Sequence, residues 1–354
     1  MIPGWKVRRE LSRLGQQLRA VPEAIWEPVA RRRHDAALLQ GFPLTQGSVP
    51  LGSKVAIILC WQPNGIVPSF LETLDHLIRN GYAPFVVANA AILASDRPDI
   101  ISRSWRTMER PNFGYDFGGY RDGLVMLRRW GVTPERLVIM NDSVWFPVWA
   151  SDDTLQQAER TASDVAGMIL RNRNDSDFLE SYFFSIKGTV LDHAGFRAFW
   201  DGLRLTSNKY KVIRRGERGF GAALTKSGLT MGALFPRARF LDAIAALNSA
   251  SLRQVLRYAA SPDPDTIAGA MALANAPDSP VWQDAARSYV ERVLLKGQVY
   301  STLPVLAAKL NYPVLKKSRE PVSACWRNAF LRAVQDGVLP PPLPTVLVEA
   351  RQAT

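Results

Sequence analysis

The sequence is poor in the residues that build metal centres and disulfide frameworks. Its 354 residues include 2 cysteines and 3 histidines. Cys60 and Cys325 are far apart and have no metal-ligand spacing, and the scattered His34, His76 and His193 add none. We therefore expect no structural zinc. Cys60 lies inside an apolar run, which predicts a buried thiol.

Long hydrophobic runs are also missing. No stretch of about 18 consecutive apolar residues appears, and the first residues are too charged and irregular for a secretory leader. With 47% hydrophobic residues, the chain can nevertheless bury a sizeable core. We expect a globular protein of the cytoplasm, which could lie peripherally on the inner face of the cytoplasmic membrane.

Acidic residues are outnumbered by basic ones, 32 against 44, so the net charge is +12. Charge of this sign is typical of proteins that bind nucleic acid, anionic membranes or phosphorylated ligands, and charge alone does not choose among these. The basic residues concentrate in residues 1–40 and 209–218. These two segments are the candidates for an anionic partner.

Residues 1–40 have the pattern of one or two amphipathic helices, with Trp5 and Trp26 among the arginines. Two interpretations stay open for this segment. Its basic residues and tryptophans could lie against an anionic membrane surface. Alternatively, the helix packs on the main domain and exposes a solvated basic face.

An alternation of strands and helices begins at Lys54. The apolar run 55–61, a helical pattern over 70–78 and the mostly apolar segment 84–90 predict a parallel strand-helix-strand crossover. A weaker unit follows over 92–111. This order predicts an α/β fold with a Rossmann-type mixed sheet flanked by helices.

The most informative stretch is 110–147, in which a glycine-rich turn, an amphipathic helix and a buried strand follow one another. Gly114, Gly118 and Gly119 allow a sharp turn and a close approach to a ligand, with Asp116 in the same turn. The strand 137–140 is followed by the sequence Asn-Asp-Ser. The carboxyl end of a strand is the usual ligand edge of an open α/β sheet, which favours a binding site there.

Later segments complete the pattern. We expect strands over 165–170 and 181–186, a helix over 195–203, an aperiodic basic segment over 208–219 and a helix that ends at Gly228. Residues beyond 240 pattern mostly as helices. The proline-rich tail 339–354 is predicted to be extended.

Four motifs in this order, RPNFGYDFGGYRDGL, LVIMNDSVWFP, ESYFFSIKGTVL and GERGFGAALTKSG, resemble the rhamnan synthesis protein F family of bacterial glycosyltransferases. The resemblance covers about residues 54–235. It implies a glycosyltransferase A-like (GT-A-like) domain over 51–240, between a basic helical segment with its linker (1–50) and a mainly helical region with the proline-rich tail (241–354). It also implies a nucleotide-diphosphate sugar donor, with rhamnose or another deoxyhexose as the first expectation, and a growing cell-surface polysaccharide or lipid-linked glycan as acceptor.

The resemblance also implies where the donor binds. The expected donor-binding residues surround the ends of the first strands and the glycine turn, and are Trp61, Gln62, Asn89, Asn112, Gly114, Tyr115, Asp116, Tyr120, Arg121, Asn141 and Ser143. Glu180, Tyr182 and Trp145 are the expected acceptor-binding residues.

The catalytic roles fall to Asp142 and Glu217. In place of the usual Asp-x-Asp motif stands Asn141-Asp142-Ser143, with one carboxylate. Either Asp142 holds a divalent cation, Mg²⁺ or Mn²⁺, or basic residues of 209–218 replace the metal. Glu217 is the expected general base of an inverting transfer, and its basic neighbours should keep it ionised. Glu180 and Asp116 are the reserve candidates, and Asp116 more naturally holds sugar hydroxyls.

Other classes of protein remain to be weighed. A basic protein without catalysis that binds an anionic polymer or nucleic acid is the alternative, but no helix-turn-helix or known nucleic-acid module is visible, so we expect no nucleic-acid partner. A dinucleotide oxidoreductase is excluded because no G-x-G-x-x-G follows the first strand.

Overall fold

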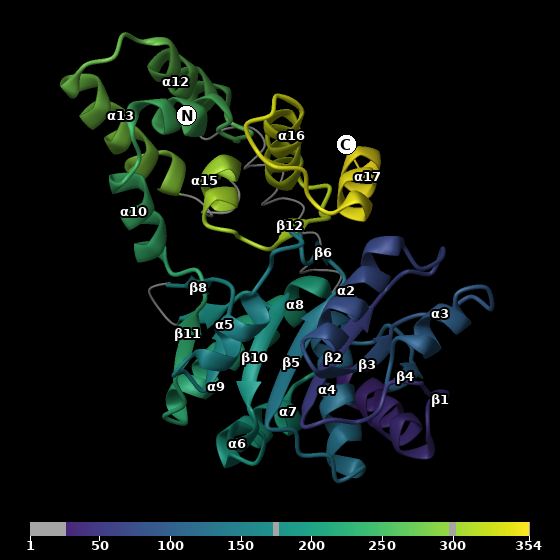
Figure 1. Ribbon diagram of the computed structural model, residues 1–354. Coiled ribbons are helices and arrows are strands. Elements are labelled where there is room, and N and C mark those ends of the chain that lie inside the picture. Colours follow the sequence, from purple (N-terminus) through teal and green to yellow (C-terminus); the bar gives the residue numbers. More distant parts are fainter. Residues whose placement is uncertain (1–25, 173–176, 297–301, 354) are drawn as a thin grey trace.

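The computed structural model describes residues 26–172, 177–296 and 302–353 (Figure 1). The amphipathic pattern expected before residue 25, which includes Trp5, lies outside this range. The described part of the N-terminal segment is a helix over residues 26–40.

An eight-stranded mixed sheet forms the centre of the molecule, in the order β1-β4-β3-β2-β5-β10-β7-β11. Its strands are β1 (Leu44–Gln46), β2 (Lys54–Cys60), β3 (Tyr82–Ala88), β4 (Arg106–Glu109), β5 (Arg136–Asn141), β7 (Val165–Gly167), β10 (Phe183–Lys187) and β11 (Met231–Ala233). The four strands β4, β3, β2 and β5 are parallel, whereas β10 is antiparallel to both of its neighbours. Two antiparallel pairs lie outside this sheet: β6 (Val144–Trp145) with β12 (Leu315–Lys316), and β8 (Leu170–Arg171) with β9 (Phe178–Leu179).

Helices cover both faces of the sheet (Figure 1). Those of the first part of the chain are α2 (Pro68–Arg79), α3 (Arg97–Ser102), α4 (Tyr115–Arg129), α5 (Thr154–Arg160), α6 (Gly188–Leu191), α7 (Ala194–Gly202), α8 (Lys209–Ile213), the π-helix η1 (Arg214–Arg218) and α9 (Gly219–Lys226). The predicted crossover is confirmed, because β2, α2 and β3 follow one another and the two strands pair in parallel.

Strand β2 shows why the sheet needs a cover on each face. Ile57 and Leu59 belong to one hydrophobic core with apolar residues of α4, while Ile58 and Cys60 belong to a second core with those of α2. Successive side chains of a strand point to opposite faces, so a run that is apolar throughout must be buried on both. The thiol of Cys60 is buried, as expected.

The strand order places a crevice at the carboxyl ends of β2 and β5. From β2 the chain moves outward through β3 to β4, and then α4 carries it back to β5 on the other side of β2. The direction of winding reverses between β2 and β5. In open α/β sheets, ligands bind outside the strand ends at such a switch point.

Two segments expected to be irregular are ordered. The basic segment over 208–219 is helical: Oδ1 of Asn208 caps α8 by accepting a hydrogen bond from the backbone N–H of Lys211, and η1 follows. A side-chain cap and two successive short helices order this segment, and neither feature shows in the hydrophobic periodicity of the sequence. In the expected linker, β1 adds an antiparallel edge strand to β4.

The last third of the described chain is helical, as expected. Its helices are α10 (Arg237–Ala245), α11 (Ser249–Arg257), α12 (Pro264–Asn275), α13 (Pro280–Arg292), the 3₁₀ helix η2 (Leu294–Lys296), α15 (Pro304–Lys309), α16 (Pro321–Gln335) and α17 (Pro344–Gln352). The prediction of an extended tail was wrong, because α17 occupies it. Pro344 begins the helix, where a missing N–H costs nothing, and Glu349 fixes the helix to α2 by accepting hydrogen bonds from Ser69.

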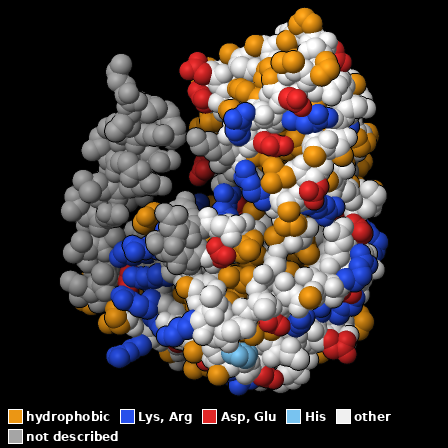
Figure 2. Space-filling view, turned by 90° about the vertical axis from the view of Figure 1, so that its left-hand side faces the viewer, with side chains coloured by type: hydrophobic (Ala, Val, Ile, Leu, Met, Phe, Trp, Pro, Cys, Tyr) orange, Lys and Arg blue, Asp and Glu red, His pale blue; other side chains and the backbone are white. Residues whose placement is uncertain are grey.

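The predicted fold class, a mixed α/β sheet flanked by helices with a helical C-terminal region, is confirmed. Within the described ranges, every helix is too short or too polar to cross a bilayer. Figure 2 shows Lys and Arg side chains in several separate groups over the face that it presents, with acidic side chains among them.

Candidate active site

A cleft of about 750 Å³ opens at the switch point between β2 and β5. Its lining residues come from the ends of β2, β3 and β5, from the turn before α4, from α8 and η1, and from the C-terminal region. The lining residues that the sequence predicted are Trp61, Gln62, Asn89, Asn112, Tyr115, Asp116, Asp142, Ser143, Trp145 and Glu217. Residues distant in the sequence therefore meet in one place.

Asp142 lies directly beyond β5. Its Oδ2 accepts hydrogen bonds from the backbone N–H of Trp61 over 2.9 Å and from Nε2 of Gln62 over 3.0 Å, so the ends of β2 and β5 are joined through this carboxylate. Burial raises the pKa of Asp142, while the two N–H donors and the ammonium of Lys317 oppose that shift. The donors hold one oxygen of Asp142 in place at the floor of the cleft.

Asp116 stands opposite, in the first turn of α4. Gly114 (φ 79°) and Tyr115 (φ 50°) both have left-handed backbones, and this turn starts the helix with Asp116 facing the cleft. Nδ2 of Asn141 donates a hydrogen bond to Oδ2 of Asp116 over 3.0 Å. Burial first, and then the charge of Asp142, raise the pKa of Asp116 to about 6.

Gly118 and Gly119 serve packing rather than ligand approach. A Cβ on Gly119 would lie 2.0 Å from Cδ1 of Leu59, and one on Gly118 would lie 2.1 Å from the carbonyl oxygen of Phe113. Neither glycine lines the cleft. The absent side chain of Gly119 lets α4 lie close to β2, and that of Gly118 lets the preceding loop lie against α4.

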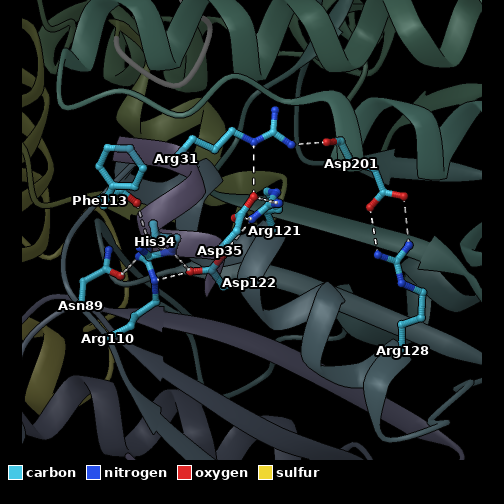
Figure 3. A network of polar contacts seen from close by, with 10 residues as sticks. All are labelled: Arg31, His34, Asp35, Asn89, Arg110, Phe113, Arg121, Asp122, Arg128 and Asp201. Atoms are coloured by element: carbon cyan, nitrogen blue, oxygen red, sulfur yellow. Dashed lines mark hydrogen bonds and ion pairs between the residues drawn. The ribbon is translucent and has the colours of Figure 1, made fainter. Parts of the chain in front are cut away.

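A buried network fixes the other wall of the cleft (Figure 3). Arg110 donates from Nε to Oδ2 of Asp122 over 2.6 Å, and from its two terminal nitrogens to Oδ1 of Asn89 and to the carbonyl oxygen of Phe113. Nε2 of His34, on the N-terminal helix, donates to the same carboxylate over 2.7 Å. Asn89 in turn donates to Asn112 over 3.0 Å. The N-terminal helix is thereby linked to two amides that line the cleft.

Glu217 enters the cleft from the π-helix η1, a type of helix that is frequent at functional sites. The hydroxyl of Ser181 donates to its Oε1 over 2.5 Å. Burial is the main cause that raises the pKa of Glu217, and the Ser181 hydroxyl opposes it. The basic neighbours do not lower this pKa as the sequence suggested, because Lys211 and Arg215 turn to Glu27 of the N-terminal helix.

Several predicted residues support the cleft or lie away from it. Gly114, Tyr120, Arg121, Asn141, Glu180 and Tyr182 are absent from its lining. Arg121 pairs with Asp35 of the N-terminal helix. Glu180 binds Arg171 and Lys316, and the hydroxyl of Tyr182 contacts that of Tyr312. The hydroxyl of Tyr120 donates to the carbonyl oxygen of Ser181, which steadies the neighbour of Glu217.

The C-terminal region supplies a wall that the sequence reasoning missed. Lys317, Arg319, Glu349, Gln352 and Ala353 line the cleft. They lie more than 170 residues after Asp142 and follow no motif. The only local sign was the basic pair Lys316-Lys317 next to a short apolar run, which is too common a pattern to indicate a site.

The fold and the cleft define an α/β protein with a cleft at the carboxyl edge of its sheet, lined by carboxylates and amides. Comparison with known proteins identifies the family. Residues 85–250 match the family described as rhamnan synthesis protein F. The uncharacterized protein y4gN of Sinorhizobium fredii (strain NBRC 101917 / NGR234) is 30% identical over 343 residues, which cover 94% of this chain and 88% of that protein. The chain belongs to the rhamnan synthesis protein F family.

Solved structures are only distantly similar. The mannosyltransferase PcManGT from Pyrobaculum calidifontis, solved with GDP-Man and Mn²⁺, has a TM-score of 0.32 at 13% identity and covers 95% of this chain and 89% of its own. The galactosyltransferase LgtC, solved with donor and acceptor sugar analogs, has a TM-score of 0.33 at 10% identity, with coverages of 85% and 100%.

Proposed function

We propose that this chain is a glycosyltransferase, which moves a sugar from a nucleotide-diphosphate donor to a hydroxyl of a glycan or lipid-linked acceptor. Membership of the rhamnan synthesis protein F family supports glycosyl transfer in general. The observation that carries the proposal is the meeting of three carboxylates, Asp116, Asp142 and Glu217, in one cleft at the switch point of the sheet.

The donor is proposed to lie along the strand ends. Asn89 and Asn112 present amides that can bind base or ribose, and the half-exposed ring of Trp61 can cover the base. Asp116 faces the same space and can accept hydrogen bonds from sugar hydroxyls when it is ionised. Its pKa of about 6 leaves it mostly ionised at neutral pH.

Glu217 is proposed as the general base of an inverting transfer. Its carboxylate takes the proton of the acceptor hydroxyl as that oxygen forms a bond to the anomeric carbon. The bond from this carbon to the phosphate oxygen breaks, and the electron pair leaves with the nucleoside diphosphate. The raised pKa of Glu217 suits this role, since a base works best when its pKa lies nearer the operating pH.

The cleft fits a divalent cation that the substrate helps to hold. Among the described residues, no group of three or more His, Cys, Asp and Glu could bind a metal by itself. Mg²⁺ is usually bound by one or two carboxylates together with substrate phosphates, and Asp142 and Asp116 are carboxylates of one cleft whose charges interact. These two residues would hold the ion. When bound, it would offset the negative charge of the leaving diphosphate.

The family name suggests the sugar and the pathway class. We propose rhamnose or another deoxyhexose as the sugar and a cell-surface polysaccharide as the product. Trp145, at the wall of the cleft, is the proposed acceptor contact that remains after Glu180 and Tyr182 are placed elsewhere. Peripheral contact with an anionic membrane through residues 1–40 stays part of the proposal.

A turnover assay tests the function. Purified protein is incubated with UDP-, GDP- and dTDP-activated sugars and a lipid-linked or glycan acceptor, with and without Mn²⁺, and release of the nucleoside diphosphate is followed. We expect release with one donor, and its loss in Asp142→Ala and in Glu217→Ala. Full activity in both variants would contradict the site, and no release with any donor would contradict the function.

A further inference from the structure

The cleft contains a cation whose surroundings point to a ligand. Lys317 lies next to β12 and lines the cleft together with Asp142 and Glu349. It lies outside the region that matches the family, residues 85–250. No motif of the sequence singles it out.

Its backbone is held firmly. Strand β12 pairs antiparallel with β6, with Leu315 opposite Trp145, and the backbone N–H of Lys317 donates to the carbonyl oxygen of Ser143 over 3.0 Å. Ser143 directly follows Asp142. The C-terminal region thus places Lys317 beside the end of β5, where the proposed donor's phosphates would lie.

The ammonium of Lys317 has few partners. Its Nζ lies 3.4 Å from Oγ of Ser69 and 5.6 Å from the centre of the Trp145 ring. No carboxylate of the described residues forms an ion pair with it at 4.0 Å or less. An ammonium has three N–H donors, so the protein leaves part of this capacity unused.

The nearby carboxylates are already bound to other donors. Glu349 accepts from the backbone N–H of Ser69 and, on its other oxygen, from Oγ of Ser69 and Nε1 of Trp145 over 2.8 Å. Oδ2 of Asp142 accepts from Trp61 and Gln62. Burial lowers the pKa of Lys317, and the charges of Asp142 and Glu349 oppose this shift. Within the part of the chain that the structure describes, this partly desolvated cation therefore has no matched anion, which is costly unless a ligand supplies one.

The other cations of the cleft differ from Lys317. Lys209 and Arg319 also line it, but both are exposed to solvent. Of the basic cluster over 209–218, Lys211 and Arg215 are turned to Glu27. Of Lys209, Lys317 and Arg319, Lys317 is the partly buried one. A charge shielded from water acts more strongly on an anion.

We propose that Lys317 binds the diphosphate of the nucleotide donor and of the product nucleoside diphosphate. The inference rests on the proposed function and names a residue for it that lies in the C-terminal region. Charge-assisted hydrogen bonds from the ammonium to phosphate oxygens replace its contact with Ser69 or add to it. The C-terminal region is then part of the active site, not an appendage beside it.

Calorimetry with nucleotides tests this role. The probes are UDP, GDP and dTDP, each beside its nucleoside monophosphate, measured in EDTA and again in Mn²⁺. Wild type is expected to bind one of the diphosphates. Lys317→Met should weaken that binding by about tenfold to a hundredfold, since one charge-assisted contact is lost, and should weaken monophosphate binding less. Lys317→Arg, which keeps the charge, should retain more affinity.

Lys309→Met is the matched control. Nζ of Lys309 also lies 3.4 Å from a serine hydroxyl, that of Ser251, but Lys309 is exposed and outside the cleft. Its removal should leave nucleotide affinity unchanged. Lys317→Gln, which keeps an N–H donor near Ser69 without the charge, provides a second test should Lys317→Met fail to fold.

The possible failures are separable. If wild type binds a diphosphate and the two uncharged Lys317 variants bind it equally well, the role of Lys317 is wrong while the proposed function stands. If wild type binds none of the three diphosphates in either EDTA or Mn²⁺, both are overturned. An equal loss in Lys309→Met would show a general effect of net charge and would also contradict the inference.

Discussion

Asn141 donates a hydrogen bond from Nδ2 to Oδ2 of Asp116 over 3.0 Å, and so joins the end of β5 to the first turn of α4. Oδ1 of Asn141 accepts from the backbone and hydroxyl of Ser143. Asn141, the first residue of the Asn-Asp-Ser sequence, thus holds the carboxylate of another segment. The two halves of the stretch 110–147 meet at this contact, between residues that are 25 apart in the sequence, and form one side of the cleft.

The first prediction concerns Asp116. Its pKa, raised to about 6, means that the folded protein holds this proton more tightly than the unfolded chain does, whose ordinary value is 3.8. The group therefore costs stability progressively as pH rises from about 4 to about 6, and the cost persists above that window. Asp116→Asn should raise the melting temperature at neutral pH by a few degrees and lose this pH dependence. Thermal unfolding across the pH range measures both.

The same variant should bind the donor more weakly, because the acceptor for sugar hydroxyls is changed. A gain in stability with a loss of donor affinity is typical of a functional carboxylate. If Asp116→Asn were less stable than wild type at neutral pH, the electrostatic account of this residue would be wrong.

Glu217 and Ser181 give the second prediction. Glu217→Gln should lower kcat by about a hundredfold to ten-thousandfold and leave donor affinity nearly unchanged, since a general base acts in the transition state. Ser181→Ala removes a hydrogen bond that lowers the pKa of Glu217. The rising limb of the kcat profile should then move to higher pH, because more base is protonated at a given pH.

A control for Glu217 is available at the far end of β5. Glu135 is exposed and directly precedes this strand, whereas the cleft lies beyond its last residue. Glu135→Gln should keep the wild-type kcat and pH profile. A profile that does not move in Ser181→Ala would show that Glu217 is not the group that titrates in the reaction.

How much of this site could be foreseen from the sequence depends on how local its signals are. Asp116 and Asp142 each stand beside a turn or a strand end, so periodicity and turn chemistry locate them. Strand β2 is apolar on both faces and marks the centre of the sheet without any tertiary information. The predicted domain boundaries near residues 50 and 240 stay predictions.

Long-range contacts account for what was missed. Lys317 and Glu349 reach the cleft because β12 pairs with β6 and α17 binds Ser69, and neither contact leaves a periodic trace in the sequence. Glu180 directly precedes the expected strand 181–186, but it pairs with Arg171 and Lys316 and does not line the cleft. The sequence predicted that the glycines of the turn allow a close approach of a ligand. The groups that approach them belong to β2 and to the preceding loop.

Metal binding provides the third prediction. If Asp142 and Asp116 hold a cation jointly with the substrate, Mn²⁺ alone should bind weakly, and a bound nucleoside diphosphate should tighten it. Each ligand must strengthen the other by the same factor. Titration of Mn²⁺ followed by electron paramagnetic resonance, with and without the diphosphate, measures that factor. This coupling factor should fall towards one in Asp142→Asn. It should keep its wild-type value in Asp153→Asn, because the Asp153 carboxylate is exposed and lies outside the cleft.

The last prediction concerns the buried pair of Arg110 and Asp122. Both side chains are 0% exposed, and the carboxylate of Asp122 also binds His34 (Figure 3). Asp122→Asn leaves the guanidinium of Arg110 buried without its counter-charge, and removing one partner of such a pair typically costs about 3–5 kcal/mol. Denaturation by urea should show a loss of this size, without a change in the slope of unfolding free energy against urea.

The exposed pair of Arg128 and Asp201, drawn in the same view, is the control. Its side chains are 46% and 51% exposed, so Asp201→Asn should cost less than about 1 kcal/mol. Because Arg110 also orients Asn89, Asp122→Asn should weaken nucleotide binding in a protein that is still folded, while Asp201→Asn should not. Equal stability losses in the two variants would show that burial does not govern this network, and unchanged nucleotide affinity in Asp122→Asn would remove its link to the cleft.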